Sequence, residues 1–257
     1  MKKCTRCGSQ NFWVLSTGQR RCSVCGLTRK KQETYWQSTQ ISPYWKGRLI
    51  EFFSLGVPAY RLRFQVPLNS KTVERWFRLI REAIYQYQLH ELESLSGEIE
   101  MDETMFGGKR PGKRGWGAAG KHIVFGIYQR NGKVLTFPVS TRGKEDLIPL
   151  MTAYTKPGCL YYTDEYRAYT FLKVLGDHVV IKKEKGRPTG RNHINGIEGF
   201  WSYAKHWLYH YRGVPKGFFP LYMKEIEWRF NNRDQNLVEL LRKCLTQPVV
   251  KEQFITI

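Results

Sequence analysis

The 257-residue sequence contains no apolar run that approaches the roughly 18 residues needed to cross a membrane. No apolar stretch follows the first residues, Met1-Lys2-Lys3-Cys4, so we expect no secretory signal. Acidic residues are scarce: 22 Asp and Glu stand against 42 Lys and Arg, a formal net charge of +20. These absences predict a cytoplasmic protein that has no membrane partner.

The excess of positive charge predicts a polyanionic partner, because Lys and Arg side chains that neutralise phosphates release condensed counterions. A disordered basic tail is not expected, since 14% of the residues are aromatic and 41% are hydrophobic. A chain of this length and composition can bury a sizeable core. The sequence therefore predicts a folded protein that binds nucleic acid.

Cysteine is also scarce, at six residues, yet four of the six lie in the first 25 positions as two C-x-x-C pairs. Two residues between thiolates let one turn present both sulfurs to a tetrahedral ion, and Gly8 and Gly26 supply the positive φ that such turns need. Reduced surface thiols are the alternative, which the paired spacing disfavours. We expect residues 1–30 to form a zinc ribbon with strands at 12–14 and 20–21, stabilised by one structural Zn²⁺. The expected zinc ligands are Cys4, Cys7, Cys22 and Cys25.

Residues 38–92 have the pattern of three helices separated by tight turns. Apolar residues recur at helical spacing from Tyr44 to Phe53, and Ser70 is a suitable N-cap for a helix over Thr72–Tyr87. The pattern fits a helix-turn-helix that presents its last helix to DNA, or an ordinary helical hairpin with a solvated charged face. The adjacent zinc ribbon and the net charge favour the first interpretation. The side chains expected to contact DNA are Lys71, Arg75 and Arg78.

Two aspartates occupy positions where α/β sheets often carry their chemistry. The segment Glu98–Phe106 alternates as a strand would, with Glu98, Glu100 and Asp102 on one face and apolar residues on the other. Carboxylates aligned on one strand repel one another unless a cation or solvent lies nearby. Asp164 ends a second apolar run, and side chains at the carboxyl ends of core strands commonly form active sites.

A third carboxylate, Glu198, lies in a segment of helical pattern that begins near Ile194. Lys205 follows it by seven residues, about two helical turns, so the two side chains share one face. Trp201 lies between them on the same helix. This combination is typical of the edge of a site.

The order of the expected elements predicts an α/β fold with a ribonuclease H-like sheet over residues 97–232. A hairpin joins strands at 122–129 and 134–139, and one more strand, a helix-like segment and the helix that carries Glu198 follow an intervening helix. Residues 233–257 are expected to form a C-terminal tail.

Asp102, Asp164 and Glu198 would suit hard divalent cations, which prefer oxygen ligands and accept phosphate oxygens in their remaining positions. Two such ions about 4 Å apart can stabilise the attacking and the leaving oxygen of a displacement at phosphorus. Most of the 22 acidic residues must be solvated surface groups. The strand-end positions of the two aspartates and the helix face of the glutamate favour a metal site.

Three stretches resemble bacterial insertion-sequence transposases of the DDE type, and among them the ISXO-like group, which joins a zinc ribbon to a ribonuclease H-like domain. The stretches are Glu100–Gly108, Thr163–Tyr166 and His193–Lys205. The resemblance implies that Asp102, Asp164 and Glu198 bind two Mg²⁺ or Mn²⁺ ions and that Lys205 fills the basic position after the glutamate. His193 matches a histidine of the family and has no assigned role. Glu227–Asn231 matches a family segment that we expect to serve packing.

The resemblance also implies a reaction and a set of partners. Water would cleave DNA at the element end to free a 3′-OH, which would then attack a target phosphate. The zinc ribbon and helix-turn-helix would bind the terminal inverted repeats, and a homodimer or larger assembly would hold two ends in the nucleoid of a bacterium. The alternatives are a ribonuclease H-like nuclease or resolvase, and a DNA-binding regulator with an inert catalytic domain.

A glycine-rich basic segment, residues 107–121, directly follows the strand that carries Asp102. It is expected to clamp phosphates near the metals, or to be a solvated insertion between strands. Its basic side chains are Lys109, Arg110, Lys113, Arg114 and Lys121.

Overall fold

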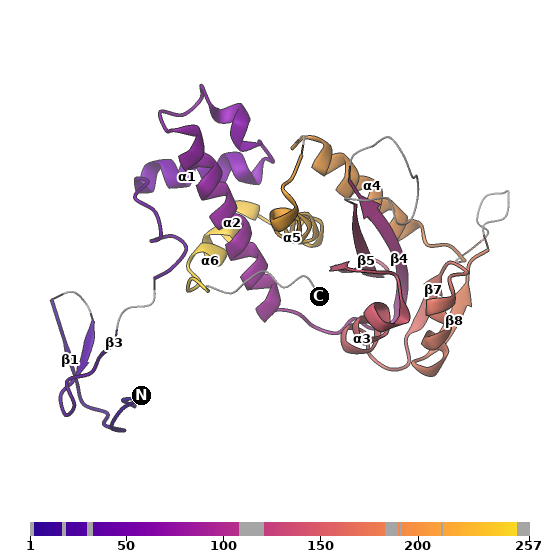
Figure 1. Ribbon diagram of the computed structural model, residues 1–257, viewed down its shortest axis with the longest axis horizontal. Coiled ribbons are helices and arrows are strands. Elements are labelled where there is room, and N and C mark those ends of the chain that lie inside the picture. The colour runs from indigo at the N-terminus through magenta and orange to yellow at the C-terminus, as the bar shows by residue number, and fades with distance from the viewer. Residues whose placement is uncertain are drawn as a thin grey trace.

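The computed structural model describes residues 3–16, 19–29, 33–107, 121–182, 190, 192–211 and 213–250. The basic residues Lys109, Arg110, Lys113 and Arg114 therefore lie outside the described residues, whereas Lys121 lies within them. Figure 1 shows a small N-terminal β module, a helical part and a larger α/β part. Within the described ranges, the helices are all too short or too polar to cross a membrane.

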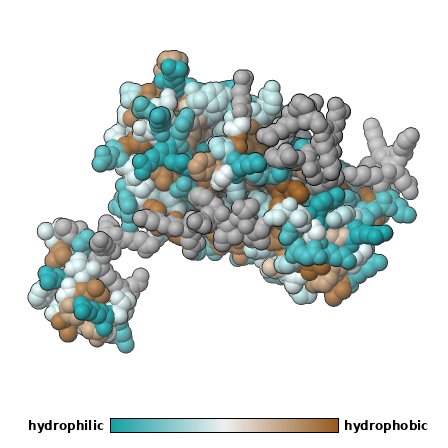
Figure 2. Space-filling model, viewed as in Figure 1, coloured by the Kyte–Doolittle hydropathy of each residue, from teal (hydrophilic) through white to brown (hydrophobic). Residues whose placement is uncertain are grey.

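The N-terminal module is a three-stranded antiparallel sheet of β1 (Phe12–Val14), β2 (Arg20–Cys22) and β3 (Thr28–Arg29). The two strands expected from the sequence are confirmed, and β3 adds a third beside β2. Apolar side chains remain on its surface, visible as brown patches on the small module in Figure 2. Such a small sheet with exposed apolar residues cannot be stabilised by burial alone. The exposed apolar residues of the module include Trp13, Val14 and Val24.

The helical part contains α1 (Pro43–Ser54), the 3₁₀ turn η1 (Ala59–Leu62) and α2 (Ser70–His90). The expected helices are present, but the middle one is a single short turn. The expected N-cap at Ser70 is wrong: the Asn69 side chain accepts a hydrogen bond from the backbone N–H of Lys71 at 2.9 Å, and Ser70 is already the first helical residue. Asparagine is as good a cap as serine, so local preference alone does not separate the two.

The segment expected as a C-terminal tail contains helix α6 (Leu237–Leu245), which packs against α2 and α1. Its buried residues join those of α1 and α2 in one hydrophobic cluster, together with Trp228. The long helix α2 has an apolar face at the centre of this cluster. The helical part thus combines helices that precede the α/β part in the sequence with one that follows it. The α6 residues in the cluster are Leu241, Cys244 and Leu245.

The α/β part is built on a mixed five-stranded sheet in the order β6-β5-β4-β7-β8. Strands β4, β5 and β6 pair antiparallel, whereas β4, β7 and β8 pair parallel. The expected hairpin is confirmed at the expected residues, while β8 was not predicted. The strands are β4 (Glu98–Phe106), β5 (His122–Gln129), β6 (Val134–Val139), β7 (Leu160–Thr163) and β8 (Asp177–Val180).

Helices cover both faces of this sheet, giving three layers. On one face, α3 (Lys144–Tyr154) and the 3₁₀ helix η2 (Arg167–Val174) pack on Ile99 and Met101 of β4. On the other face, α4 (Asn195–Tyr209) and α5 (Phe219–Asn231), preceded by the short η3 (Lys216–Phe218), enclose a second cluster. The apolar face expected for Glu98–Phe106 is thereby confirmed.

Helix α5 also covers the edge strand β6. Asn231 accepts a hydrogen bond from the backbone N–H of Val134 and donates one to its carbonyl, both at 2.8 Å. Glu227 accepts from the backbone N–H of Thr136 at 2.6 Å. The next outward-facing position is Pro138, which has no N–H to satisfy. The expectation that Glu227–Asn231 serves packing is therefore confirmed.

A buried ion cluster joins the helical and α/β parts. Glu225 on α5 lies between Arg81 of α2, at 2.6 Å, and Arg229 one turn further on, at 2.8 Å. Arg229 also donates to the carbonyl of Ser54 at the end of α1, at 2.9 Å. All three charged side chains are almost fully buried, so each relies on the others for compensation.

We predict that Glu225→Ala lowers the free energy of unfolding by about 3–5 kcal/mol, because two buried guanidinium groups would lose their counter-charge. Chemical denaturation of the purified protein measures this loss. Glu51→Ala serves as the control, since Glu51 pairs with Arg48 on the surface of α1 and should matter by less than about 1 kcal/mol. Similar small losses in both variants would contradict the assigned role of the cluster.

Candidate active site and metal centre

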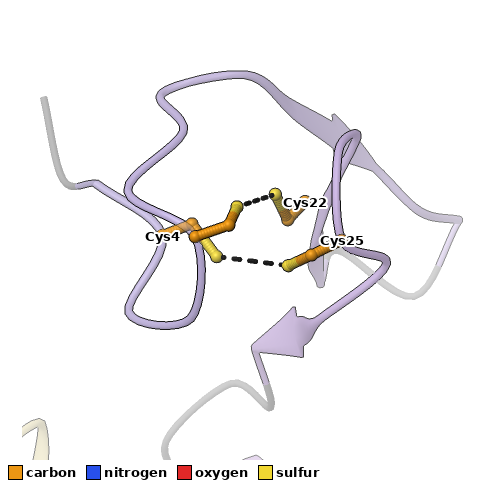
Figure 3. A group of neighbouring side chains, drawn as sticks. Cys4, Cys22 and Cys25 are labelled. Atoms are coloured by element: carbon orange, nitrogen blue, oxygen red, sulfur yellow. Dashed lines mark hydrogen bonds between the residues drawn. The ribbon is translucent and has the colours of Figure 1, made fainter.

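The four N-terminal cysteines form a compact group of sulfurs. All four Sγ atoms lie within 4.8 Å of one another, with Cys4–Cys25 at 3.6 Å and Cys7–Cys22 at 3.5 Å. Figure 3 shows the sulfurs of the labelled cysteines turned toward a common centre. Zinc bound by four thiolates at about 2.3 Å has sulfur–sulfur separations of about 3.8 Å, so the observed spacing fits a tetrahedral ion.

The backbone around these cysteines also favours metal binding. Gly8 and Gly26 have φ of 72° and 70°, and each donates its N–H to the carbonyl of the first cysteine in the preceding pair. Hydrogen bonds from the backbone of Cys25 and, less strongly, of Val24 lower the pKa of the Cys22 thiol to about 6, against the effect of burial. A thiol ionised near neutral pH is ready to act as a ligand. The expected zinc site is thus supported by its geometry.

The register of two parallel strands brings the predicted aspartates level with each other. Glu100 of β4 pairs with Tyr162 of β7, the last pair between these strands, and Asp102 and Asp164 each follow that pair by two residues. The strand-end position expected for Asp102 is wrong, because β4 continues beside β5 to Phe106 and Asp102 is its middle residue. Asp164 follows the last residue of β7, and its Oδ1 accepts a hydrogen bond from the backbone N–H of Tyr166 at 3.0 Å. Both side chains are partly exposed.

The charges of the two aspartates raise the pKa values of the same two buried groups, Glu103 and Tyr169, on the other face of the sheet. Burial raises the pKa of Glu103 to about 7, and the charges of Asp102 and Asp164 add to the rise while Arg142, 3.5 Å away, opposes it. Burial likewise raises the pKa of Tyr169 well above its usual range, with contributions from the same carboxylates. Negative charge is therefore concentrated around the middle of β4 and the carboxyl end of β7.

The N-terminus of helix α4 is fixed on β4 by Glu100. One oxygen of this buried carboxylate accepts the backbone N–H of Ile197 at 2.9 Å, and the other accepts Nε of Arg130 at 2.8 Å. Gly196 makes the approach possible, because a Cβ there would lie 2.2 Å from the ring of Tyr128. The start of α4 is thereby held against the strand that carries Asp102.

The same helix contacts Asp102 directly. Nε1 of Trp201 donates to Oδ2 of Asp102 at 3.1 Å. Gly126, the cross-strand partner of Asp102, leaves room for the indole, since a Cβ there would lie 2.5 Å from Trp201 and 2.8 Å from Ile197. Glu198 is on α4 one turn before Trp201 and is exposed.

The remaining predicted site residues have different surroundings. Lys205 is exposed on α4, two turns after Glu198. Among the described residues, the cysteine group is the one set of three or more possible ligands with atoms within 4.8 Å, so the three carboxylates are less tightly gathered than the thiols. Lys121 precedes β5. His193 lies 3.8 Å from Glu100, and its carbonyl accepts Nη2 of Arg130 at 2.5 Å.

The α2 residues that are expected to contact DNA line a groove. Lys71, Arg75 and Arg78 face the segment between α4 and α5 across a space of about 500 Å³. Lys71 and Arg75 are exposed, and the Arg78 guanidinium lies 5.1 Å above the ring of Phe218. Lys71, Arg75 and Arg78 therefore line one groove, and none of the three predicted carboxylates lines it.

Sequence analysis missed Glu103, Arg130 and Arg142 as parts of the site. One signal was available: strand alternation puts Glu103 on the apolar face of β4, where an acid requires a partner. Arg130 was interpreted only as a turn residue of the hairpin, and its long-range ion pairs with Glu98 and Glu100 leave no local pattern.

A family model described as an ISXO2-like transposase domain matches residues 94–231, which include β4 to α5 and all three predicted carboxylates. The chain belongs to the ISXO2-like transposase family. A Haemophilus influenzae protein described as an uncharacterized transposase-like protein is 36% identical over 120 residues. That alignment covers 46% of this ISXO2-like chain and 98% of the relative. The family expected from the sequence motifs is therefore confirmed.

For the N-terminal module we predict one zinc ion per chain in the purified protein, measured by elemental analysis. Cys22→Ser should lose the zinc, because three thiolates remain where four are needed for a closed tetrahedral site. Cys159→Ser is the matched control, since Cys159 is buried beside Leu95, far along the chain from the cluster, and should keep the metal. Full zinc content in Cys22→Ser would exclude the assigned ligand set.

For the active-site scaffold we predict that Gly126→Ala lowers the free energy of unfolding by about 1–3 kcal/mol, because the added methyl group collides with Trp201. The indole N–H resonance of Trp201 should shift as its hydrogen bond to Asp102 is displaced. Gly199→Ala is the control: a Cβ there meets nothing within 4 Å, and alanine suits a helix interior better than glycine. An unshifted indole signal in Gly126→Ala would contradict this account.

Proposed function

We propose that this protein is a DNA transposase that binds the ends of its element and catalyses metal-dependent cleavage and strand transfer of DNA at Asp102, Asp164 and Glu198. Its family membership supports the broad function. The observation that supports the proposed chemistry is the parallel register of β4 and β7, in which Asp102, within β4, and Asp164, just after the carboxyl end of β7, each follow the pair Glu100–Tyr162 by two residues. Such strand ends are where α/β sheets bind their substrates.

Glu198 is proposed as the third metal ligand because helix α4, which carries it, crosses the sheet beside Asp102. The contact between Trp201 and Asp102 brings the first turns of α4 close to the aspartates, and Glu198 lies one turn before that contact. The three carboxylates offer oxygen ligands only, which suits Mg²⁺ or Mn²⁺, and their mutual repulsion is relieved by a cation. None of the three side chains is buried, so each remains accessible to a divalent ion.

The proposed reaction has two displacements at phosphorus. Divalent ions bound by the carboxylates would supply Lewis-acid stabilisation of the attacking and leaving oxygens. The indole of Trp201 holds one oxygen of Asp102 and so orients the carboxylate. Lys205, on the same exposed side of α4 as Glu198, would bind DNA phosphates beside the site. Water attacks first and frees a 3′-OH, and that hydroxyl then attacks the target strand.

The sheet order supports a ribonuclease H-like catalytic domain over residues 97–232. Three antiparallel strands, a helix, and further strands parallel to the first precede a carboxylate-bearing helix, the order expected for that fold. The zinc ribbon of residues 1–30 and the helix-turn-helix of residues 38–92 would bind the terminal inverted repeats, with Lys121 contacting phosphates next to the site. Two ends held together would require a homodimer or a larger assembly.

The proposal predicts that Asp102→Asn, Asp164→Asn and Glu198→Gln each reduce Mg²⁺-dependent cleavage of element-end DNA by at least about 10²–10³-fold. Binding of the same DNA without divalent metal should change little, because none of these acids is expected to attract phosphate. Gel assays of end cleavage and strand transfer with the zinc-loaded protein measure both steps.

Glu165→Gln is the matched control, since Glu165 is an exposed acid next to Asp164 and should leave cleavage intact. Wild-type cleavage rates in any of the three site variants would refute that residue's role as a metal ligand. Cleavage without any strand transfer by the wild-type protein would favour a nuclease over a transposase.

A further inference from the structure

A groove in the helical part has none of the three predicted carboxylates in its lining. Its space is about 500 Å³, and its walls are η1 with the preceding Pro58, the first half of α2, and residues between 211 and 222. This volume is that of a small-ligand site and holds one or two nucleotides. The proposed function of the carboxylates does not use it.

Positive charge and aromatic rings share this groove. Among its described lining residues, four are basic and one, Glu74, is acidic. Arg81 is compensated by Glu225, so Lys71 and Arg75 carry the exposed charge. The ring of Tyr60 is 48% exposed at the rim, and its hydroxyl donates to the carbonyl of His210 at 3.3 Å. The other aromatic rings in the lining are Phe77, Tyr211, Phe218 and Tyr222.

The shape of this surface argues against duplex reading by the face of α2 that lines the groove, so the helix-turn-helix would bind the terminal inverted repeats through its other surfaces. A recognition helix enters the major groove because it protrudes from its domain. Here the basic face of α2 is instead the wall of a recess, with the segment from Tyr211 to Tyr222 opposite it. A recess lined by arginine, lysine and aromatic rings suits a single strand, whose phosphates bind the cations and whose bases stack on the rings.

The groove is also within reach of the carboxylates along α4. Glu198 and Lys205 are exposed on this helix, which ends at Tyr209 and leads directly to Tyr211 in the groove wall. The eleven steps along α4 from Glu198 to Tyr209 span about 16 Å at 1.5 Å per residue. At the duplex rise of about 3.4 Å per nucleotide, a stacked strand covers that distance in about five nucleotides, and an extended unpaired strand needs fewer.

From these features we infer that the groove between α2 and residues 211–222 binds an unpaired stretch of DNA, a few nucleotides from the phosphate that is cleaved. The ring of Tyr60 stacks on a base, and Lys71 and Arg75 bind the neighbouring phosphates. This inference rests on the proposed function for its substrate, DNA, but the binding it describes needs no divalent metal and no cleavage.

The test is fluorescence anisotropy with the full-length zinc-loaded protein in EDTA-free buffer without Mg²⁺, using a labelled ten-nucleotide oligo-dT strand and a blunt duplex of equal length. Tyr60→Ala should weaken binding of the single strand by about 5- to 100-fold, the usual effect of losing one base-stacking ring, and leave the duplex unchanged. Tyr60→Phe keeps the ring and should bind as the wild type does.

Phe64→Ala is the matched control, because Phe64 is an exposed aromatic just beyond η1, with Arg63 beside it, and it is not among the groove residues. It should leave both affinities unchanged. Arg75→Ala should reduce the slope of log K against log salt for the single strand by about 0.7, the loss of one neutralised phosphate. Circular dichroism and thermal unfolding would establish that each variant is folded.

Equal loss of single-strand and duplex affinity in Tyr60→Ala would overturn the inference and favour duplex reading by α2. An unchanged single-strand affinity would overturn it as well. Because no step depends on catalysis, an inactive carboxylate site combined with ring-dependent single-strand binding would refute the proposed chemistry and support the groove.

Discussion

The position of helix α4 depends on one buried carboxylate, Glu100, and the candidate site depends on that helix. A buried charge is tolerated only when its partners are in place, and here these are the backbone N–H of Ile197 in the first turn of α4 and the guanidinium of Arg130. The helix can therefore start at only one point on β4. One turn later Trp201 reaches Asp102, and its hydrogen bond to that carboxylate fixes the helix a second time.

A second set of buried charges connects the two halves of the molecule. Glu225 neutralises arginines from α2 and α5, and one of these also binds the end of α1. The basic groove and the carboxylates are thereby held on one continuous framework. A DNA strand that touched both surfaces would meet them at a fixed separation.

The sequence was most informative where structure follows from local rules. The C-x-x-C spacing, the hairpin at Arg130 and the alternation along β4 each depend on neighbouring residues, and each was correctly predicted. Strand β8 and the cap at Asn69 were missed, since a short edge strand needs its partner β7 and equivalent caps compete locally. The ion pairs of Arg130 and Arg142 join distant segments, which no local pattern encodes. The roles of the three carboxylates stay predictions.

The hydrogen bonds that cover the outer edge of β6 restrict how two copies of this chain can associate. Its outer backbone groups are already bonded by side chains of α5, and the remaining outward position is a proline. A neighbouring molecule therefore finds no free donors there with which to continue the sheet. An assembly that joins two copies on paired DNA ends would therefore not extend the sheet at β6, which leaves the opposite edge strand β8, the helices, the loops and the DNA itself as the joining surfaces.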